Sequence, residues 1–140
     1  RRVKLKAAEI SLWREGGREW PVIFPGYVPD AELAVLYSRA VFYVFPSLYE
    51  GFGLPPLEAM SHACAVASSN QASLPEIIGD AAVYFNPYDK ADMLEKMKTL
   101  LLDENLRRRL IERGHKRAAS FSWRECARQT LEIYRRILEK

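Results

Sequence analysis

The chain has 140 residues, which suits one domain and leaves little room for a second. Hydrophobic residues make up 49% and charged residues 28%, a balance that excludes disordered and collagen-like classes. The net charge of +3 fits a slightly cationic surface, a phosphate-bearing partner or an anionic membrane surface, and does not by itself indicate nucleic acid.

The first part of the chain alternates predicted helices and strands. Residues 4–14 carry apolar side chains at helical spacing and predict a helix that ends at the following glycine pair. Residues 21–28 predict a strand, and Asp30 is the candidate N-cap of the next helix. The apolar run at residues 41–45 is typical of a strand that is buried on both faces of a parallel sheet.

The alternation continues after a glycine-containing loop. Two prolines open the next predicted helix, where their missing N–H groups cost nothing. Short apolar runs at residues 65–67 and 82–85 predict two more strands, and Ser73–Glu76 between them fits a capping box that opens a short helix. This order of elements implies crossover connections, so the predicted fold class is α/β with a Rossmann-like open parallel sheet and flanking helices.

Helices are predicted from Asp89 to the end of the chain. A second capping box at Ser122–Glu125 opens the last helix, which carries an apolar stripe. We expect Trp123 and Tyr134 on that stripe to lie in the core. The basic residues of the preceding helix predict a solvated face, with a membrane-surface role as the alternative: Arg107, Arg108, Arg109, Arg113, Lys116 and Arg117.

Cysteines and histidines give no sign of a metal site. Cys64 and Cys126 fall in apolar patterns, and we expect both to be buried thiols in a reducing compartment. His62 and His115 are expected on the surface or on a helix face, and the four residues lack zinc-ligand spacing. No apolar run is long enough to span a bilayer, and no signal peptide is visible.

The loop at residues 47–54 has the position and composition of a ligand site. It follows a predicted buried strand and precedes a helix, which is where open parallel sheets bind ligands. Its glycines let main-chain amides approach a ligand, and the free N–H groups of the helix N-terminus suit a phosphate. The loop has no P-loop lysine, which argues against triphosphate hydrolysis.

Two carboxylates, Glu50 and Glu58, bracket this loop. Glu58 has an ordinary explanation, because acidic residues stabilise helix N-termini. Glu50 precedes Gly51, where turns more commonly use Asp or Asn, and its carboxylate could accept hydrogen bonds from the paired hydroxyls of a ribose or hexose. The residues alone leave two interpretations open, a polyol-phosphate site and a plain structural loop.

The sequence around this loop resembles a known family. Residues 50–60, EGFGLPPLEAM, are similar to the Glu-x7-Glu motif of the retaining glycosyltransferases of the GT-B fold, family 4. The likeness covers about Val22 to Ile137, with further matching segments at residues 24–28, 37–46, 69–80 and 121–123.

The resemblance implies a truncated C-terminal half of a GT-B fold. Residues 1–140 would form a partial nucleotide-sugar binding domain, with its C-terminal helices at about residues 89–140. The acceptor domain and the first strand of the donor domain are expected to be absent from this chain. The fragment alone is therefore expected to be inactive.

The motif match also assigns site residues. Glu50 would be catalytic, contacting hydroxyls of the transferred sugar and helping to position it at the reacting carbon. Glu58 would bind the ribose hydroxyls, and the turn at Tyr27 and Val28 would lie near the base. Phe52 is the one aromatic residue expected near the substrate. Main-chain amides would hold the sugar and the diphosphate: Gly51, Phe52, Gly53 and Leu54.

The implied reaction transfers a hexose, such as mannose or glucose, with retention at the anomeric carbon. The donor would be UDP- or GDP-linked, and no metal or other cofactor would be required. Stabilisation of the departing diphosphate would be the main catalytic effect. The acceptor would be a glycan or a lipid-linked molecule bound through the missing N-terminal domain, and no nucleic-acid partner is expected.

The resemblance implies a cytoplasmic enzyme of polysaccharide or glycolipid assembly, and peripheral contact with the inner face of the membrane stays open. One alternative is a catalytically inactive GT-B-like module that binds a nucleotide sugar or another protein. Another is a different GT-B enzyme, such as an epimerase or phosphorylase. The intact pair of Glu50 and Glu58 favours the transferase.

Overall fold

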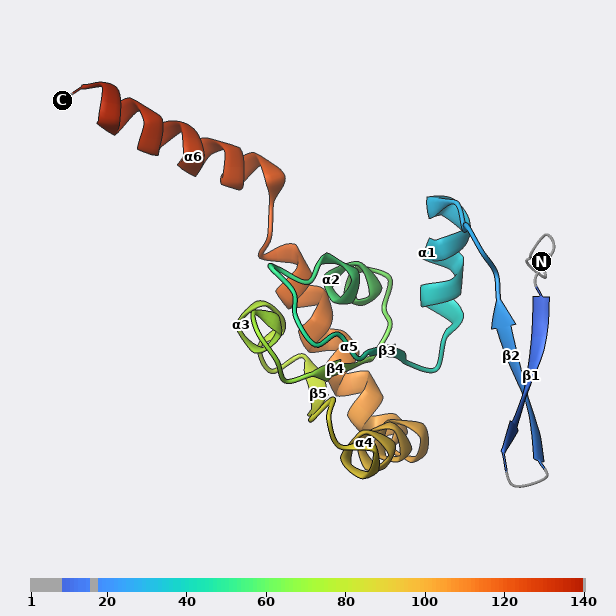
Figure 1. The fold of residues 1–140 in the computed structure, drawn as a ribbon. Helices are drawn as coiled ribbons and strands as arrows, with labels where there is room; N and C mark the ends of the chain where they lie inside the picture. Colours follow the sequence, from blue (N-terminus) through green and yellow to red (C-terminus); the bar gives the residue numbers. More distant parts are fainter. Residues whose placement is uncertain (1–8, 16–17, 140) are drawn as a thin grey trace. The chain divides into compact units, whose positions relative to one another are not determined.

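The computed structural model describes residues 9–15 and 18–139, which fall into two compact units (Figure 1). The first unit comprises residues 1–36 and the second residues 37–140. The beginning of the helix predicted over residues 4–14, and the glycine pair that follows it, lie outside the described residues.

The first unit contains an antiparallel hairpin in place of the first predicted helix. β1 (Glu9–Glu15) pairs with β2 (Arg18–Phe24), and Glu15 lies opposite Arg18 in the register. The helix prediction is therefore wrong over residues 9–14. In the sequence, residues 9–12 (EISL) alternate polar and apolar side chains, which also fits a strand, and a Gly-Gly pair between two strand-like runs is a recognised hairpin signal.

The strand predicted at residues 21–28 is confirmed only in part. β2 begins earlier, at Arg18, and ends at Phe24, directly before Pro25. It belongs to a two-stranded antiparallel sheet, so it does not join the parallel sheet of the second unit. Pro25 follows the strand directly, but a missing proline N–H does not by itself end β2, because Pro21 lies inside the strand opposite Leu12.

α1 (Asp30–Arg39) confirms the helix that follows. The N-cap prediction is wrong by one residue, because Asp30 is the first helical residue. The carbonyl of Pro29 accepts the first hydrogen bonds, from the N–H groups of Glu32 and Leu33 at 2.9 Å each. Asp30 and Glu32 both lie in the first turn, where a negative charge is favourable.

The second unit is built on a three-stranded parallel sheet with helical crossovers. β3 (Tyr43–Phe45), β4 (Val66–Ser69) and β5 (Ala82–Phe85) lie in the order β3-β4-β5. α2 (Leu54–Ser61) connects β3 to β4, and α3 (Leu74–Ile78) connects β4 to β5. The predicted α/β class with a parallel sheet and flanking helices is confirmed.

The strands differ in burial according to their place in the sheet. The central strand β4 is buried along its whole length, whereas β3 is half-buried. The expectation that residues 41–45 are buried on both faces is thus wrong, because β3 is an edge strand. β5 is half-buried, like β3, except at its last residue, Phe85. Phe85 is buried and lies in the core with Ala67 of β4.

α4 (Lys90–Leu102) and α5 (Glu104–Ala119) confirm the predicted helices and complete this core through Leu100 and Leu110. Asp89 caps α4 by accepting hydrogen bonds from two N–H groups of its first turn, and Asp103 caps α5 by accepting one hydrogen bond, from the Leu106 N–H. α5 also packs closely on α2, since a Cβ atom at Gly114 would lie 2.9 Å from Cγ of Met60.

Two arginines of α5 hold other helix ends, so the predicted solvated face is wrong for them. Arg107 donates to the carbonyl oxygens of Leu100 at 2.5 Å and Leu101 at 2.9 Å. Arg117 donates to the carbonyl oxygens of Ile77 at 2.7 Å and Glu76 at 2.5 Å. Carbonyls at the ends of α4 and α3 lack helical partners, and the guanidinium groups satisfy them.

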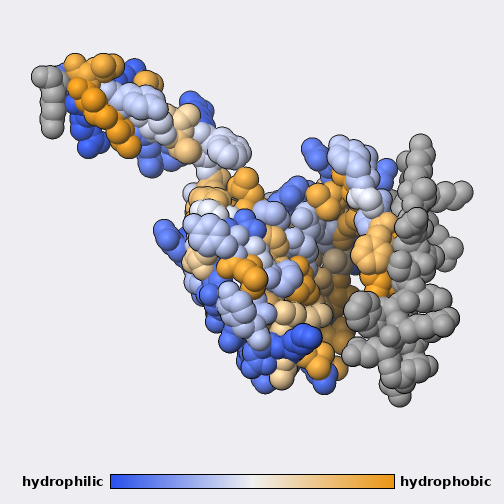
Figure 2. All heavy atoms as spheres, viewed as in Figure 1, coloured by the Kyte–Doolittle hydropathy of each residue, from blue (hydrophilic) through white to orange (hydrophobic). Residues whose placement is uncertain are grey.

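α6 (Trp123–Leu138) exposes its apolar stripe, along which hydrophobic atoms gather (Figure 2). Trp123 is 78% exposed and Tyr134 is 61% exposed, so the prediction that they lie in the core is wrong. The sequence pattern identifies an apolar face, but no element of the described chain covers it. Ser122 caps the helix by accepting from the Glu125 N–H, while the Glu125 carboxylate pairs with Arg128 and completes no capping box.

The two cysteines differ in burial. Cys64 is buried as predicted, but Cys126 is exposed, which overturns its predicted burial. Burial raises the pKa of Cys64 to about 11. A thiol with that pKa is ionised to roughly one part in a thousand at pH 8, and the thiolate is the reactive form.

We therefore expect iodoacetamide at pH 8 to alkylate Cys126 at least about 100-fold faster than Cys64. Mass spectrometry of peptides sampled over time measures both rates in one experiment. Labelling in denaturant is the control, because both thiols should then react at similar rates. Equal rates in the native protein would contradict the burial of Cys64.

Candidate functional site

The carboxyl ends of the three parallel strands meet at one edge of the sheet. The loop after β3 carries the segment Glu50–Gly53, called the motif loop below, and leads into α2. Residues 70–73 follow β4 and lead into α3. Because β3 and β4 are adjacent, their following loops lie side by side at the edge where parallel sheets bind ligands.

Gly53 fixes the end of the motif loop. Its φ of 101° and ψ of 52° lie in the left-handed region, and it is the N-cap residue of α2. A Cβ atom there would lie 2.7 Å from Cδ2 of Leu74, the first residue of α3. Gly51, in contrast, has open space around the position of a Cβ atom. Only Gly53 of the two is thus required for conformation and close packing.

The main-chain donors of this site come chiefly from the loop. α2 begins at Leu54, and its next two residues, Pro55 and Pro56, have no N–H group. The expectation that the helix N-terminus supplies several free donors is therefore corrected to the N–H of Leu54. Within the described part of the chain, the loop and this first helical residue have N–H groups without a hydrogen-bond partner: Gly51, Phe52, Gly53 and Leu54.

Both carboxylates are available for a ligand. Glu50 is half-buried and Glu58 is exposed. Among residues 22–139, neither side chain takes part in an ion pair or a side-chain hydrogen bond. The two acidic groups therefore do not serve to hold the interior together, which leaves them free to accept hydrogen bonds from hydroxyl groups.

Glu58 lies beside a small aromatic cluster. Burial raises the pKa of Tyr37, and the nearby charge of Glu58 raises it further. The rings of Tyr37 and Tyr43 meet edge to face at 5.3 Å, and His62 stacks on Tyr37 at 6.1 Å. The Nδ1 atom of His62 lies 2.9 Å from the Glu58 carbonyl oxygen, at the end of α2. His62 thus has a structural place on a helix end, as expected.

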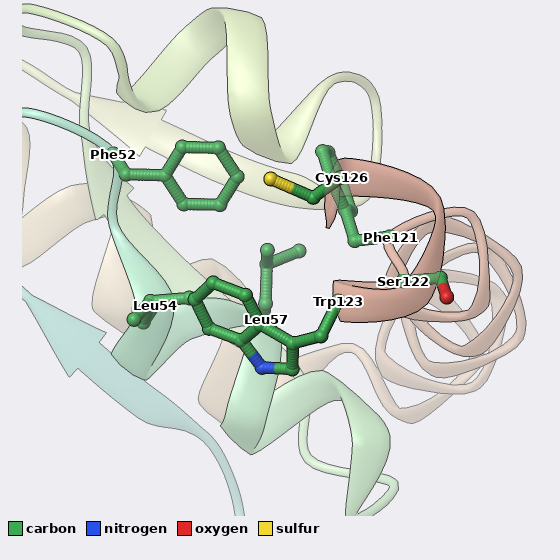
Figure 3. A pocket seen from close by; sticks show the side chains of 7 residues that line it. All are labelled: Phe52, Leu54, Leu57, Phe121, Ser122, Trp123 and Cys126. Carbon is green, nitrogen blue, oxygen red and sulfur yellow. The ribbon is translucent and has the colours of Figure 1, made fainter. Parts of the chain in front are cut away.

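The side chain of Phe52 belongs to an apolar pocket. Its ring meets Phe121 edge to face at 5.5 Å, and the Arg117 guanidinium lies 4.9 Å from the Phe121 ring centre. The pocket has a volume of about 390 Å³, and its lining residues come from the motif loop, α2, the segment just before α6 and α6 itself (Figure 3). It is lined by Phe52, Leu54, Leu57, Phe121, Ser122, Trp123 and Cys126.

This pocket has almost no polar group and includes neither Glu50 nor Glu58. It is therefore unsuited to a polyol or a diphosphate, which need hydrogen-bond partners. The contribution of Phe52 to a polar ligand would come from its main-chain N–H. Contact between its ring and a substrate stays a prediction.

The predicted capping box at Ser73–Glu76 is wrong. Ser73 is the N-cap residue of α3, but its side chain makes no capping hydrogen bond. Its φ of −75° and ψ of −12° are helical, whereas a capping serine normally has extended angles. The Ser73 hydroxyl instead donates to the carbonyl oxygens of Glu50 at 2.9 Å and Phe52 at 3.1 Å. It thus ties α3 to the motif loop.

Two further predicted site residues precede the second unit in the chain. Tyr27 and Val28 belong to the first unit, so their place beside a nucleotide base stays a prediction. Within the part of the chain that the structure describes, no group of three or more His, Cys, Asp or Glu side chains could hold a metal ion. In the same residues, no helix is both long and apolar enough to cross a bilayer.

Comparison with known proteins gives consistent matches. The family described as "Glycosyl transferases group 1" matches residues 11–117. The chain is 42% identical over 127 residues to O-antigen chain mannosyltransferase B of Escherichia coli, covering 89% of this chain and 33% of that protein. It is 43% identical over 118 residues to the serotype-specific mannosyltransferase WbdA of Escherichia coli, covering 84% of this chain and 14% of that protein.

A solved structure shares the fold as well. Sucrose-phosphate synthase from Thermosynechococcus elongatus is similar with a TM-score of 0.73 and 30% identity, over 81% of this chain and 29% of that chain. The chain therefore spans about a third or less of the length of these relatives.

Proposed function

Because the chain belongs to the glycosyl transferases group 1 family, we propose that it is the donor-binding part of a retaining glycosyltransferase. The full-length protein transfers a hexose from a nucleotide diphosphate sugar to a glycan or lipid-linked acceptor. The observation that carries this proposal is that two carboxylates, Glu50 and Glu58, and the N–H groups of the loop between them have no hydrogen-bond or ion-pair partner among the described residues. Such an arrangement suits a ligand that has both hydroxyls and phosphates.

Each part of the site has a role in this proposal. Glu50 accepts hydrogen bonds from hydroxyls of the transferred sugar and positions the reacting carbon. Glu58 accepts hydrogen bonds from the ribose, and Val28 lies near the base. Main-chain N–H groups hold the sugar and the diphosphate: Gly51, Phe52, Gly53 and Leu54.

The chemical step depends on the departing diphosphate. Cleavage of the bond between the anomeric carbon and the phosphate oxygen adds one negative charge to the leaving group. Fixed N–H donors that point at this charge stabilise the transition state more than the ground state. The proposal assigns this stabilisation to main-chain donors and requires no metal.

The names of the two Escherichia coli relatives favour mannose as the hexose and a polysaccharide as the acceptor. In the proposal, the acceptor binds to a part of the full-length protein outside this chain. The reaction takes place in the cytoplasm, with peripheral contact at the inner face of the membrane where the acceptor is lipid-linked. A calorimetric screen of the full-length protein against UDP-, GDP- and ADP-hexoses tests the donor class.

Product formation separates the transferase from the alternative of an inactive binding module. A full-length protein that binds a nucleotide sugar and transfers nothing to any glycan or lipid-linked acceptor would be such a module. Failure to bind any of the three donor classes would remove the proposed function altogether.

We expect Glu58→Ala in the full-length protein to weaken nucleoside diphosphate affinity by about 10- to 100-fold, the value of a hydrogen bond to a charged group. The readout is calorimetry with UDP and GDP, and with their 2′,3′-dideoxy analogues. The parent should prefer the ribonucleotide, and the variant should lose that preference. Glu95→Ala, at an exposed glutamate of α4, is the matched control. An unchanged preference in Glu58→Ala would remove the ribose assignment.

A further inference from the structure

Ser73 joins two loops that are distant in the sequence. Its hydroxyl lies 2.9 Å from the carbonyl oxygen of Glu50 and 3.1 Å from that of Phe52, which are 23 and 21 residues earlier. A hydroxyl has one hydrogen to donate, and both carbonyls lie within its reach, so they share it. This contact does not cap α3 and so serves the motif loop.

The contact also fixes where the loop's N–H groups point. A trans peptide holds its N–H opposite to its C=O, and the described chain has no cis peptide. When the Glu50 and Phe52 carbonyls face Ser73, the N–H groups of Gly51 and Gly53 face the other way. Neither N–H has a partner within the described residues.

Leu74 supports the loop next to this contact. A Cβ atom added to Gly53 would lie only 2.7 Å from Cδ2 of Leu74. The Leu74 side chain therefore packs directly on the Gly53 backbone. Leu74 is fully buried, which holds it in place. Ser73 and Leu74 thus form a fixed support on one side of the motif loop, and the free N–H groups lie on the other.

We propose that Ser73 is a positioning residue for the donor site, which acts by aiming the Gly51 and Gly53 N–H groups at the bound diphosphate sugar. This inference rests on the proposed function. Without the hydroxyl, the two peptide planes can rotate and the donors lose their fixed direction. Ser73 itself contacts no substrate, and its effect passes through the loop backbone.

The test uses full-length protein with Ser73→Ala, Ser73→Gly and Ser73→Thr. Loss of the hydroxyl should lower kcat by about 10- to 100-fold, the scale of a misplaced catalytic geometry. KM for the donor should change by less than about threefold, because the added negative charge appears only as the bond breaks. Ser73→Thr keeps a hydroxyl and should restore kcat to within about threefold of the parent.

A binding measurement distinguishes positioning from a general structural role. The free nucleoside diphosphate already carries the charge that the donor gains only as the bond breaks, so Ser73→Ala should weaken affinity for it and leave affinity for the nucleoside, which has no phosphate, unchanged. Ser120→Ala is the matched control, because the Ser120 hydroxyl also donates to a main-chain carbonyl, at 2.7 Å, but remains in its own helix end. It should match the parent in both measurements.

The outcomes separate this inference from the proposed function. An active parent with an equally active Ser73→Ala would overturn the inference alone, as would equal losses for nucleoside and nucleoside diphosphate. A parent inactive with every donor class would overturn the proposed function. If Ser73→Ala does not fold, Ser73→Gly removes the hydroxyl in its place. In that case Ser73→Thr, which keeps the hydroxyl, must remain folded and active for the inference to stand.

Discussion

Replacing Glu50 by alanine in the full-length protein is expected to lower kcat for hexose transfer by about 100-fold or more, while the fold survives. The carboxylate has no ion pair or side-chain hydrogen bond within the described residues, so its removal breaks no internal contact. What is lost is a charged acceptor for sugar hydroxyls, at the position that sets the orientation of the reacting carbon. Initial rates with the donor identified by the binding screen measure the effect.

Two further variants make this result specific. Glu50→Gln keeps the shape and one acceptor oxygen but removes the charge, so it should retain more activity than Glu50→Ala and less than the parent. Glu95→Ala removes an exposed carboxylate of α4 that pairs with Lys96 at 3.3 Å, and it should leave transfer unchanged. Circular dichroism and thermal unfolding confirm that the variants are folded. A turnover for Glu50→Ala equal to that of the parent would show that the assigned role is wrong.

The sequence predicts the second unit better than the first. The strands at residues 65–67 and 82–85 and the helices after Asp89 are confirmed, because alternation of long helical patterns with apolar runs leaves few arrangements other than a parallel sheet. The helix predicted over residues 4–14 is wrong from residue 9 onward, where β1 begins. Seven residues with apolar side chains at mixed spacing fit a helix and a strand equally well, and only the glycine pair after them distinguishes the two.

Some residues of the site can be predicted from the local sequence, and others depend on tertiary contacts. Gly53 at the helix start and the two carboxylates are readable from the motif itself, since their spacing and composition are local. The local sequence does not predict the contact between Ser73 and the motif loop. The Ser-x-x-Glu pattern predicts only a helix cap, because it contains no information about the neighbouring loop. The available signal was topological: loops that follow adjacent parallel strands meet, and a serine in the second can reach carbonyls in the first.

The apolar stripe of α6 shows the limit of periodicity. The pattern identifies which face of the helix is apolar, and the structure confirms that these residues share a helix. It does not identify what covers that face, since packing partners come from the rest of the protein. The same limit explains Cys126, which follows the stripe and is exposed with it.

Gly53→Ala is expected to destabilise the protein by about 2–5 kcal/mol and to abolish measurable donor binding. A left-handed backbone costs an L-residue about 1–2 kcal/mol, and the overlap with Leu74 adds about 1–3 kcal/mol of overpacking. The φ of 101° is held by the start of α2, and the 2.7 Å approach to Cδ2 of Leu74 involves a fully buried side chain that has little room to move. Urea unfolding and calorimetry measure the two effects.

Gly51→Ala is the matched control for stability, because a Cβ atom at Gly51 meets no atom within 4 Å and its φ is not positive. It should change the free energy of unfolding by less than about 1 kcal/mol. If Gly53→Ala were as stable as Gly51→Ala, the loop would be free to move away from Leu74. The support that Ser73 and Leu74 give the motif loop would then be too weak to aim its N–H groups. The proposal that these N–H groups are fixed in position to bind a diphosphate would be wrong.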